Sequence, residues 1–88
     1  VNTGRGEQNE EELSRKRIRF LIDDFCDGSQ QQFADAVGIG KSSVSQYVNG
    51  SNYPTNHRSF EIAKTFSVNP LWVMGFDVPM QNENSSIY

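Results

Sequence analysis

The sequence is poor in the residues that build disulfides and metal clusters. It holds one cysteine, Cys26, and one histidine, His57, in 88 residues. One cysteine excludes a disulfide within the chain, and the two residues together are too few for a cysteine–histidine metal cluster. This cysteine use is typical of a reducing, intracellular compartment. We therefore expect Cys26 to be a small buried apolar residue, and we expect no metal or other cofactor.

Long hydrophobic runs are also missing. No apolar stretch approaches the roughly 20 residues of a membrane-spanning helix, and the N-terminus lacks the apolar segment of a signal peptide. The sequence therefore predicts a cytoplasmic protein with no membrane contact. Alternation of apolar and polar residues with period two, which is typical of a half-buried strand, is absent too. This absence favours an all-α fold.

The chain as a whole lacks a basic excess, since its net charge is −3. Residues 13–64 nevertheless carry seven basic and five acidic side chains, whereas the flanks carry one basic and six acidic ones. The acidity therefore belongs mostly to the ends of the chain. A weakly basic centre stays compatible with a polyanionic partner.

Apolar residues concentrate between Leu13 and Met80. We therefore predict a flexible acidic N-terminal tail at residues 1–12, one small domain at residues 13–76 and a C-terminal linker or tail at residues 77–88. A core of about 65 residues lies near the lower limit for independent folding.

Capping signals divide the predicted domain into five short helices. A stripe of apolar residues with helical spacing, Ile18, Leu21, Ile22 and Phe25, predicts the first helix over 11–26. Gly28 marks its end. Ser29, with Gln32 three residues on, forms a capping-box pattern that opens the second helix, and Gly38 ends it.

The remaining three helices are bounded in the same way. The third is predicted over 41–48, before Asn49-Gly50, and the fourth over 56–66, after the loop 51–55. The fourth helix is expected to bury Phe60, Ile62, Ala63 and Phe66. Asn69-Pro70 combines an N-cap residue with the residue favoured at the first helical position, which predicts a short fifth helix over "LWVM".

The second and third helices match the spacing of a DNA-binding helix-turn-helix over residues 30–49. Ala34 is a small residue where the third helix must cross the second closely. Gly38 tolerates the positive φ that the turn requires. Val44 is a branched apolar residue that locks the crossing. The spacing of these three residues indicates a helix that is held out for recognition.

Polar side chains occupy the first two turns of the third helix, where a recognition helix meets base edges in the major groove. Lysine can donate to guanine O6 and N7, and glutamine can pair with adenine through two hydrogen bonds. An ordinary solvent-exposed helix face is also polar. The helix-turn-helix spacing around these residues favours a DNA-reading face over such an ordinary face. The predicted base-contacting residues are Lys41, Ser42, Ser43, Ser45 and Gln46.

The stretch 30–49 resembles the helix-turn-helix of lambda-repressor-like proteins, the Cro/CI type, and the resemblance covers about residues 13–80. "NPLWVMGFDVPM" is similar to the last helix of CI repressors of temperate phages from Gram-positive hosts. The resemblance implies a compact five-helix domain that represses transcription. In such repressors a linker and a C-terminal dimerisation domain follow. We expect a homodimer, on DNA or through such a domain, on a pseudo-palindromic operator, because one recognition helix contacts few base pairs.

The resemblance also implies a set of contacts to DNA phosphates. Gln30 would bind a phosphate and brace the recognition helix, and the helix start around Ser29 would add further contacts. The remaining predicted phosphate-contacting residues are Asn49, Ser51, Asn52, Tyr53, His57 and Arg58. Two positions depart from the family pattern. The loop 51–53 lacks the usual lysines and arginines, and Ser67 replaces a glycine between the fourth and fifth helices.

Enzyme functions fit the sequence poorly. "GIGKSS" resembles part of a phosphate-binding P-loop, but the required first glycine is Asp35, and a helix precedes the segment where the motif needs a strand. His57 has no plausible nucleophile around it. We therefore predict neither an enzyme nor a small-molecule substrate.

Two alternatives stay open. An antitoxin or regulatory protein-interaction module could use the same fold, although residues 76–88 are short and polar for a partner-binding element. The basic run Arg15, Lys16, Arg17 and Arg19 could form a solvated helix face, attract DNA at long range or contact a phosphate directly.

Overall fold

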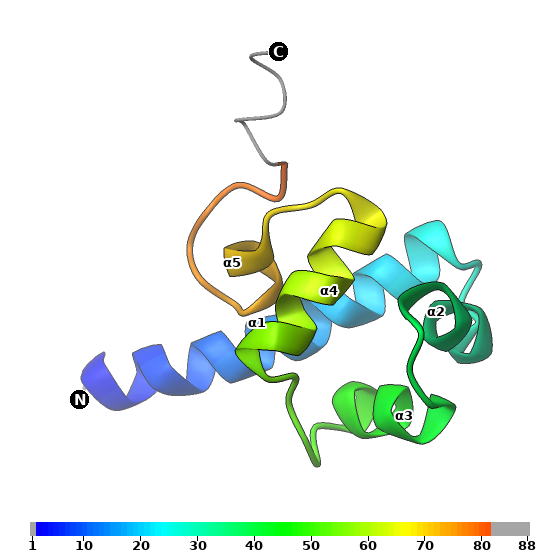
Figure 1. Cartoon of the computed structure of the whole chain (residues 1–88). Helices are drawn as coiled ribbons and strands as arrows, with labels where there is room; N and C mark the ends of the chain where they lie inside the picture. The colour runs from blue at the N-terminus through cyan, green and yellow to red at the C-terminus, as the bar shows by residue number, and fades with distance from the viewer. Residues whose placement is uncertain (1, 82–88) are drawn as a thin grey trace.

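The computed structural model describes the backbone of residues 2–81 and side chains from Glu10 to Gln81. Over this range the chain forms five helices, and its only β-pairing is a single bridge between Val68 and Gln81 (Figure 1). The helices are α1 (Asn2–Phe25), α2 (Gln30–Val37), α3 (Lys41–Asn49), α4 (Asn56–Phe66) and α5 (Pro70–Val73). The prediction of an all-α fold with five helices is confirmed.

Polar caps begin three of these helices. The Ser29 hydroxyl accepts a hydrogen bond from the Gln32 N–H at 3.1 Å, as the capping-box pattern predicts. Thr55 caps α4 and Asn69 caps α5 in the same manner. Each side-chain oxygen satisfies a backbone donor that the first helical turn leaves free. These local signals explain why α2, α4 and α5 start where they were predicted to start.

α1 begins at Asn2, well before the start at residue 11 that the apolar stripe predicts. Glutamate and glutamine, which are frequent over 7–12, have high helix propensity without needing a core contact. Apolar periodicity therefore places the start of this helix too late. The division of the chain into tail, domain and linker stays a prediction, and residues 82–88 of the proposed C-terminal tail lie outside the described residues.

The core forms where α1 crosses the other helices (Figure 1). Ile18, Leu21 and Ile22 of α1 are buried. They pack in one cluster with residues from every other helix, including Phe33, Ala34, Val44, Tyr47, Ile62, Ala63, Trp72 and Val73. Full burial of one such large apolar side chain contributes roughly 1.5–3 kcal/mol. This cluster holds α2 and α3 against α1.

Two aromatic residues that were predicted to face inward are largely exposed. Phe60 of α4 is 54% exposed, and Phe25 at the end of α1 is 48% exposed. Phe25 still stacks on Phe66 at 5.6 Å between ring centroids, and Phe66 stacks on Phe33 at 5.2 Å. The helical period shows which face of the helix a side chain lies on. It does not show how much of that face the neighbouring segments cover. The prediction that Phe60 is buried is therefore wrong.

Arg17 holds the end of α5 against α1. Its Nη1 donates to the carbonyl oxygens of Trp72 at 2.8 Å and Phe76 at 2.7 Å. Its guanidinium carbon also lies 5.1 Å from the centroid of the Trp72 ring, a cation–π distance. Val78 and Met80 pack against the core beyond this point. Arg17 therefore has a structural role that separates it from the rest of the basic run.

Candidate nucleic-acid interface

A tight turn at Gly38 joins α2 to α3. Gly38 has φ 89°, the left-handed conformation that favours glycine. The N–H groups of Gly38 and Ile39 both donate to the Ala34 carbonyl, at 2.8 and 3.0 Å. Ala34 and Val44 are fully buried where the two helices pack together. The three residues that define the predicted motif therefore lie where the motif requires them.

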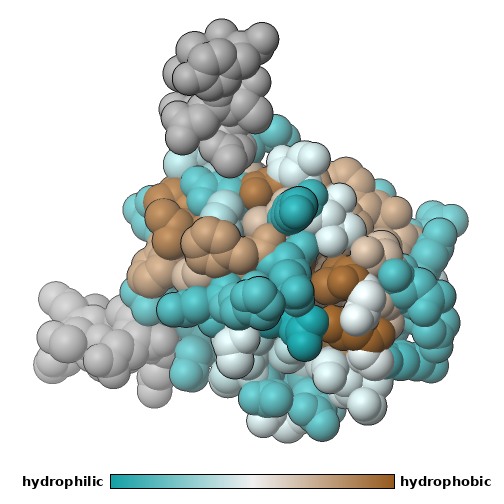
Figure 2. Space-filling view, viewed as in Figure 1, coloured by the Kyte–Doolittle hydropathy of each residue, from teal (hydrophilic) through white to brown (hydrophobic). Residues whose placement is uncertain are grey.

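α3 keeps its polar side toward solvent. Val44 and Tyr47 are its buried residues, whereas Lys41, Ser42 and Gln46 are exposed. Ser43 and Ser45 are half-buried. In Figure 2 the lower edge of the molecule, over α3, is pale to teal, whereas tan and brown surface lies over α5 on the left and in the region of α2 right of centre. Three of the five predicted base-contacting residues are therefore exposed to solvent. The other two, Ser43 and Ser45, lie nearer the core.

A hydrogen bond between side chains braces α3 against the start of α2. The Ser45 Oγ donates to Gln30 Oε1 at 2.9 Å. Because the Gln30 oxygen is occupied, its Nε2 group keeps two donors for another acceptor. The geometry is compatible with a phosphate contact by Gln30. Because the Ser45 hydroxyl donates its hydrogen to Gln30, a contact from Ser45 to a base must use this hydroxyl as an acceptor.

The loop after α3 is organised by asparagine side chains. Asn49 Oδ1 accepts from the Ser51 N–H at 2.8 Å. Asn52 Oδ1 accepts from the Tyr53 N–H at 2.9 Å, and Asn52 Nδ2 donates to Gln46 Oε1 at 3.2 Å. Tyr53 and Pro54 are half-buried, whereas Ser51, Asn52 and Thr55 are exposed. Four predicted phosphate-contacting residues therefore lie together at the C-terminal end of α3.

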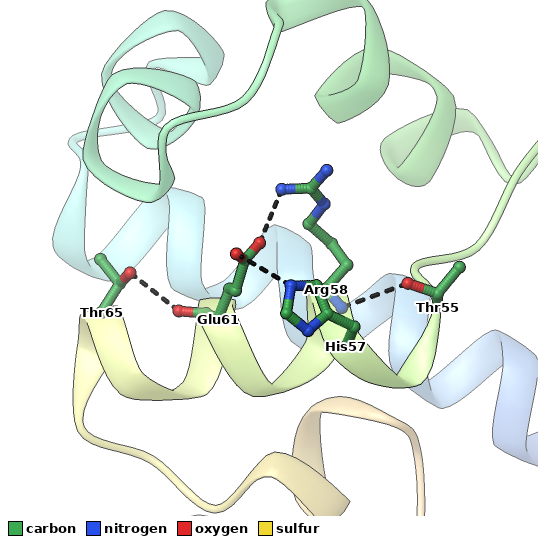
Figure 3. Close-up of polar contacts among 5 residues, drawn as sticks. All are labelled: Thr55, His57, Arg58, Glu61 and Thr65. Atoms are coloured by element: carbon green, nitrogen blue, oxygen red, sulfur yellow. Dashed lines mark hydrogen bonds and ion pairs between the residues drawn. The ribbon is translucent and has the colours of Figure 1, made fainter.

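His57 and Arg58 share one carboxylate, that of Glu61 (Figure 3). Arg58 Nη1 lies 2.7 Å from Glu61 Oε1, and His57 Nε2 lies 3.3 Å from Glu61 Oε2. Glu61 was not predicted as a partner of these residues, although its i,i+3 and i,i+4 spacing from them is the signal that could have shown it. A phosphate that binds Arg58 or His57 must compete with this carboxylate.

A family model described as Helix-turn-helix matches residues 26–73, which is more than half of the chain. The chain belongs to this helix-turn-helix family. The match includes all of α2, α3, α4 and α5, and it supports the predicted lambda-repressor-like domain. Searches of curated proteins and of solved structures found no match.

Membership makes the chain a helix-turn-helix domain of the kind that DNA-binding transcription regulators use. None of the helices within residues 2–81 combines the length and the apolar character that crossing a membrane requires.

Two basic residues of α1 lie close to the helix-turn-helix without belonging to it. Arg19 lines a small surface hollow together with Gln30. Arg15 lies beside Gly50, at the end of α3, and pairs with Glu12 at 3.5 Å. The sequence showed that both are off the apolar stripe, but it gave no contact between α1 and the loop after α3. Both arginines therefore lie near the C-terminal part of α3, since the hollow of Arg19 is also lined by Val48.

Proposed function

We propose that this helix-turn-helix domain represses transcription in the manner of phage or prophage CI repressors. Two copies occupy a pseudo-palindromic operator, and each inserts α3 into the major groove. The observation that supports the proposal is the exposed polar side of Lys41, Ser42 and Gln46, held in place by the Ser45–Gln30 hydrogen bond. Helices of this polarity read base edges with their N-terminal turns.

The proposal assigns different roles to Gln46 and Gln30. Gln46 and Lys41 contact base edges, so their contribution depends on the DNA sequence. Gln30 contacts a phosphate, which every DNA sequence supplies equally. The repressor role rests on the resemblance of residues 69–80 to phage CI repressors, and the dimer rests on the small number of base pairs that one helix reaches.

Enrichment of random DNA duplexes on the purified chain tests the proposal. We expect one enriched sequence with two-fold symmetry. Lys41→Ala and Gln46→Ala each weaken binding to that site by about fivefold to a hundredfold and change binding to scrambled DNA little. Gln30→Ala weakens binding to both duplexes.

Lys64→Ala is the matched control for Lys41→Ala, because it removes the same charge from an exposed position in the last turn of α4. Equal losses on the selected and scrambled duplexes for Lys41→Ala and Gln46→Ala would remove both residues from base recognition. Absence of any enriched sequence would overturn the function itself.

A further inference from the structure

The orientation of the Gln46 side-chain amide is determined by a chain of hydrogen bonds that starts at the backbone. The Tyr53 N–H can only donate, so the atom of Asn52 that faces it at 2.9 Å is the oxygen Oδ1. The other end of the Asn52 amide is then the donor Nδ2. This group donates to Gln46 at 3.2 Å, so the Gln46 atom that faces it is the oxygen Oε1. The backbone donor therefore sets the polarity of both amides.

The backbone also fixes the distance between these two residues. The N–H groups of Ser51 and Asn52 point at the Gln46 carbonyl oxygen, at 3.1 and 3.4 Å. Gly50, with φ 82°, supplies the turn that brings the loop back over the end of α3. Asn52 is consequently held next to the Gln46 side chain before any DNA binds.

With its oxygen held by Asn52, Gln46 has its Nε2 group, with two N–H donors, free for another partner. In the major groove guanine presents two acceptors, N7 and O6, and thymine presents O4. Adenine presents the acceptor N7 beside its amino donor N6, and cytosine presents the amino donor N4. A glutamine pairs with adenine through two hydrogen bonds only when its oxygen also accepts from N6, and here Asn52 Nδ2 already uses one of the two lone pairs of that oxygen and holds it toward the loop.

We propose that Asn52 is a positioning residue that makes Gln46 a hydrogen-bond donor toward DNA. Gln46 therefore favours guanine or thymine, which offer it acceptors alone, over adenine or cytosine, which also present an amino donor, at the position it contacts. This inference rests on the proposed function, because it concerns the base that the same helix reads. It differs from the expectation, based on residue type alone, that Gln46 pairs with adenine.

Asn52→Asp is the variant that reverses the effect. The introduced carboxylate keeps one oxygen for the Tyr53 N–H, and its second oxygen accepts instead of donating. Gln46 then turns its Nε2 group toward the loop and presents Oε1 to DNA. Base preference at the Gln46 position should change from guanine or thymine to adenine or cytosine, by about fivefold to a hundredfold in relative affinity.

The experiment enriches random duplexes on the wild-type chain, Gln46→Ala, Asn52→Asp, Asn52→Ala and Ser51→Asp. Gln46→Ala identifies the position, because preference is lost there and nowhere else. Asn52→Ala, which removes the hydrogen bond without reversing it, weakens the preference at that position. Ser51→Asp adds the same negative charge one residue away, so it lowers overall affinity and leaves the preference unchanged. Thermal melting confirms that each variant is folded, as expected for exposed positions.

Three outcomes would overturn the proposal while the proposed function stands. The wild-type chain could prefer adenine or cytosine at the Gln46 position, Gln46→Ala could leave every position unchanged, or Asn52→Asp could keep the wild-type preference. A wild-type chain that enriches no sequence would overturn the proposed function, and this inference with it.

Discussion

At the scale of single residues, the basic run 15–19 divides between different tasks. Arg17 binds two carbonyl oxygens at the end of α5. Burial lowers the pKa of this guanidinium from its ordinary value, and Asp77 opposes that shift. Arg15 and Arg19 lie beside Gly50 and Gln30 instead. The sequence could not make this division, because each task depends on a partner distant along the chain.

Ser59 of α4 tests how much a buried hydroxyl without a hydrogen-bond partner destabilises the fold. Its side chain is fully buried, and within the described part of the chain its hydroxyl has no hydrogen-bond partner. An unsatisfied buried hydroxyl destabilises the folded state, and alanine is also the better helix former. We therefore expect Ser59→Ala to raise the free energy of unfolding by about 1 kcal/mol, measured by urea denaturation.

Ser42→Ala is the control for this change, since it makes the same substitution at an exposed position of α3. Its effect should be within about 0.5 kcal/mol. A drop in stability for Ser59→Ala would show that the buried hydroxyl forms a stabilising bond.

At the scale of helices, local signals predicted most boundaries, and the start of α1 was missed because helix propensity extends this helix beyond its apolar stripe. Ser29, Gly38 and Asn69 mark helix ends through their own conformational preferences, so the chain around them suffices. Ser67 also adopts the left-handed conformation, with φ 59°, at the position where the family has glycine. The exposure of Phe60, in contrast, depends on how far the neighbouring segments cover α4, which periodicity does not show.

Two glycines separate the effect of backbone conformation from that of close packing. Gly38 and Gly75 both have positive φ, 89° and 99°. A Cβ atom at Gly38 would meet nothing within 4 Å, whereas one at Gly75 would overlap the backbone of Glu10 in α1. We expect Gly38→Ala to lower the free energy of unfolding by about 1–2 kcal/mol. Gly75→Ala should lower it by roughly 1–3 kcal/mol more.

Denaturant unfolding of both variants gives the comparison directly. Equal losses of stability would contradict the close approach of Gly75 to α1. A smaller loss for Gly75→Ala than for Gly38→Ala would contradict it more strongly.

The candidate site shows the same division between local and tertiary information. The exposed polar side of α3 could be predicted, because residue type and helical period are properties of the segment itself. The pairing of Arg58 and His57 with Glu61 and the hydrogen bond from Asn52 to Gln46 were not predicted. The spacing of Glu61 from Arg58 and His57 could have shown the first of these contacts, whereas the second depends on side-chain orientation in a loop, which the spacing of residues leaves undetermined.

At the scale of the whole molecule, positive charge is sparse around the proposed interface. Lys41 is the one charged residue of α3. Arg15 and Arg58 already pair with carboxylates, which leaves Arg19 as the other nearby cation. The loop 51–53 contributes no basic side chain. Counterion release should therefore supply a modest share of the DNA affinity.

We expect the logarithm of the association constant to fall with the logarithm of salt concentration at a slope between about −2 and −4 per domain. Fluorescence titration with a nonspecific duplex at several salt concentrations measures this slope. Lys41→Ala should leave this slope nearly unchanged, because Lys41 is proposed to contact a base edge and not a phosphate. A slope near zero would favour the alternative protein-interaction module.

The most direct test of the interface is an NMR titration of the full chain with the enriched duplex, following backbone amide shifts. We expect the largest changes at residues 41–46 and at Ser29 and Gln30, with the smallest changes in α5. Unchanged shifts over residues 41–46, with changes concentrated around Leu71 and Phe76, would show that the polar side of α3 is not the surface that meets DNA.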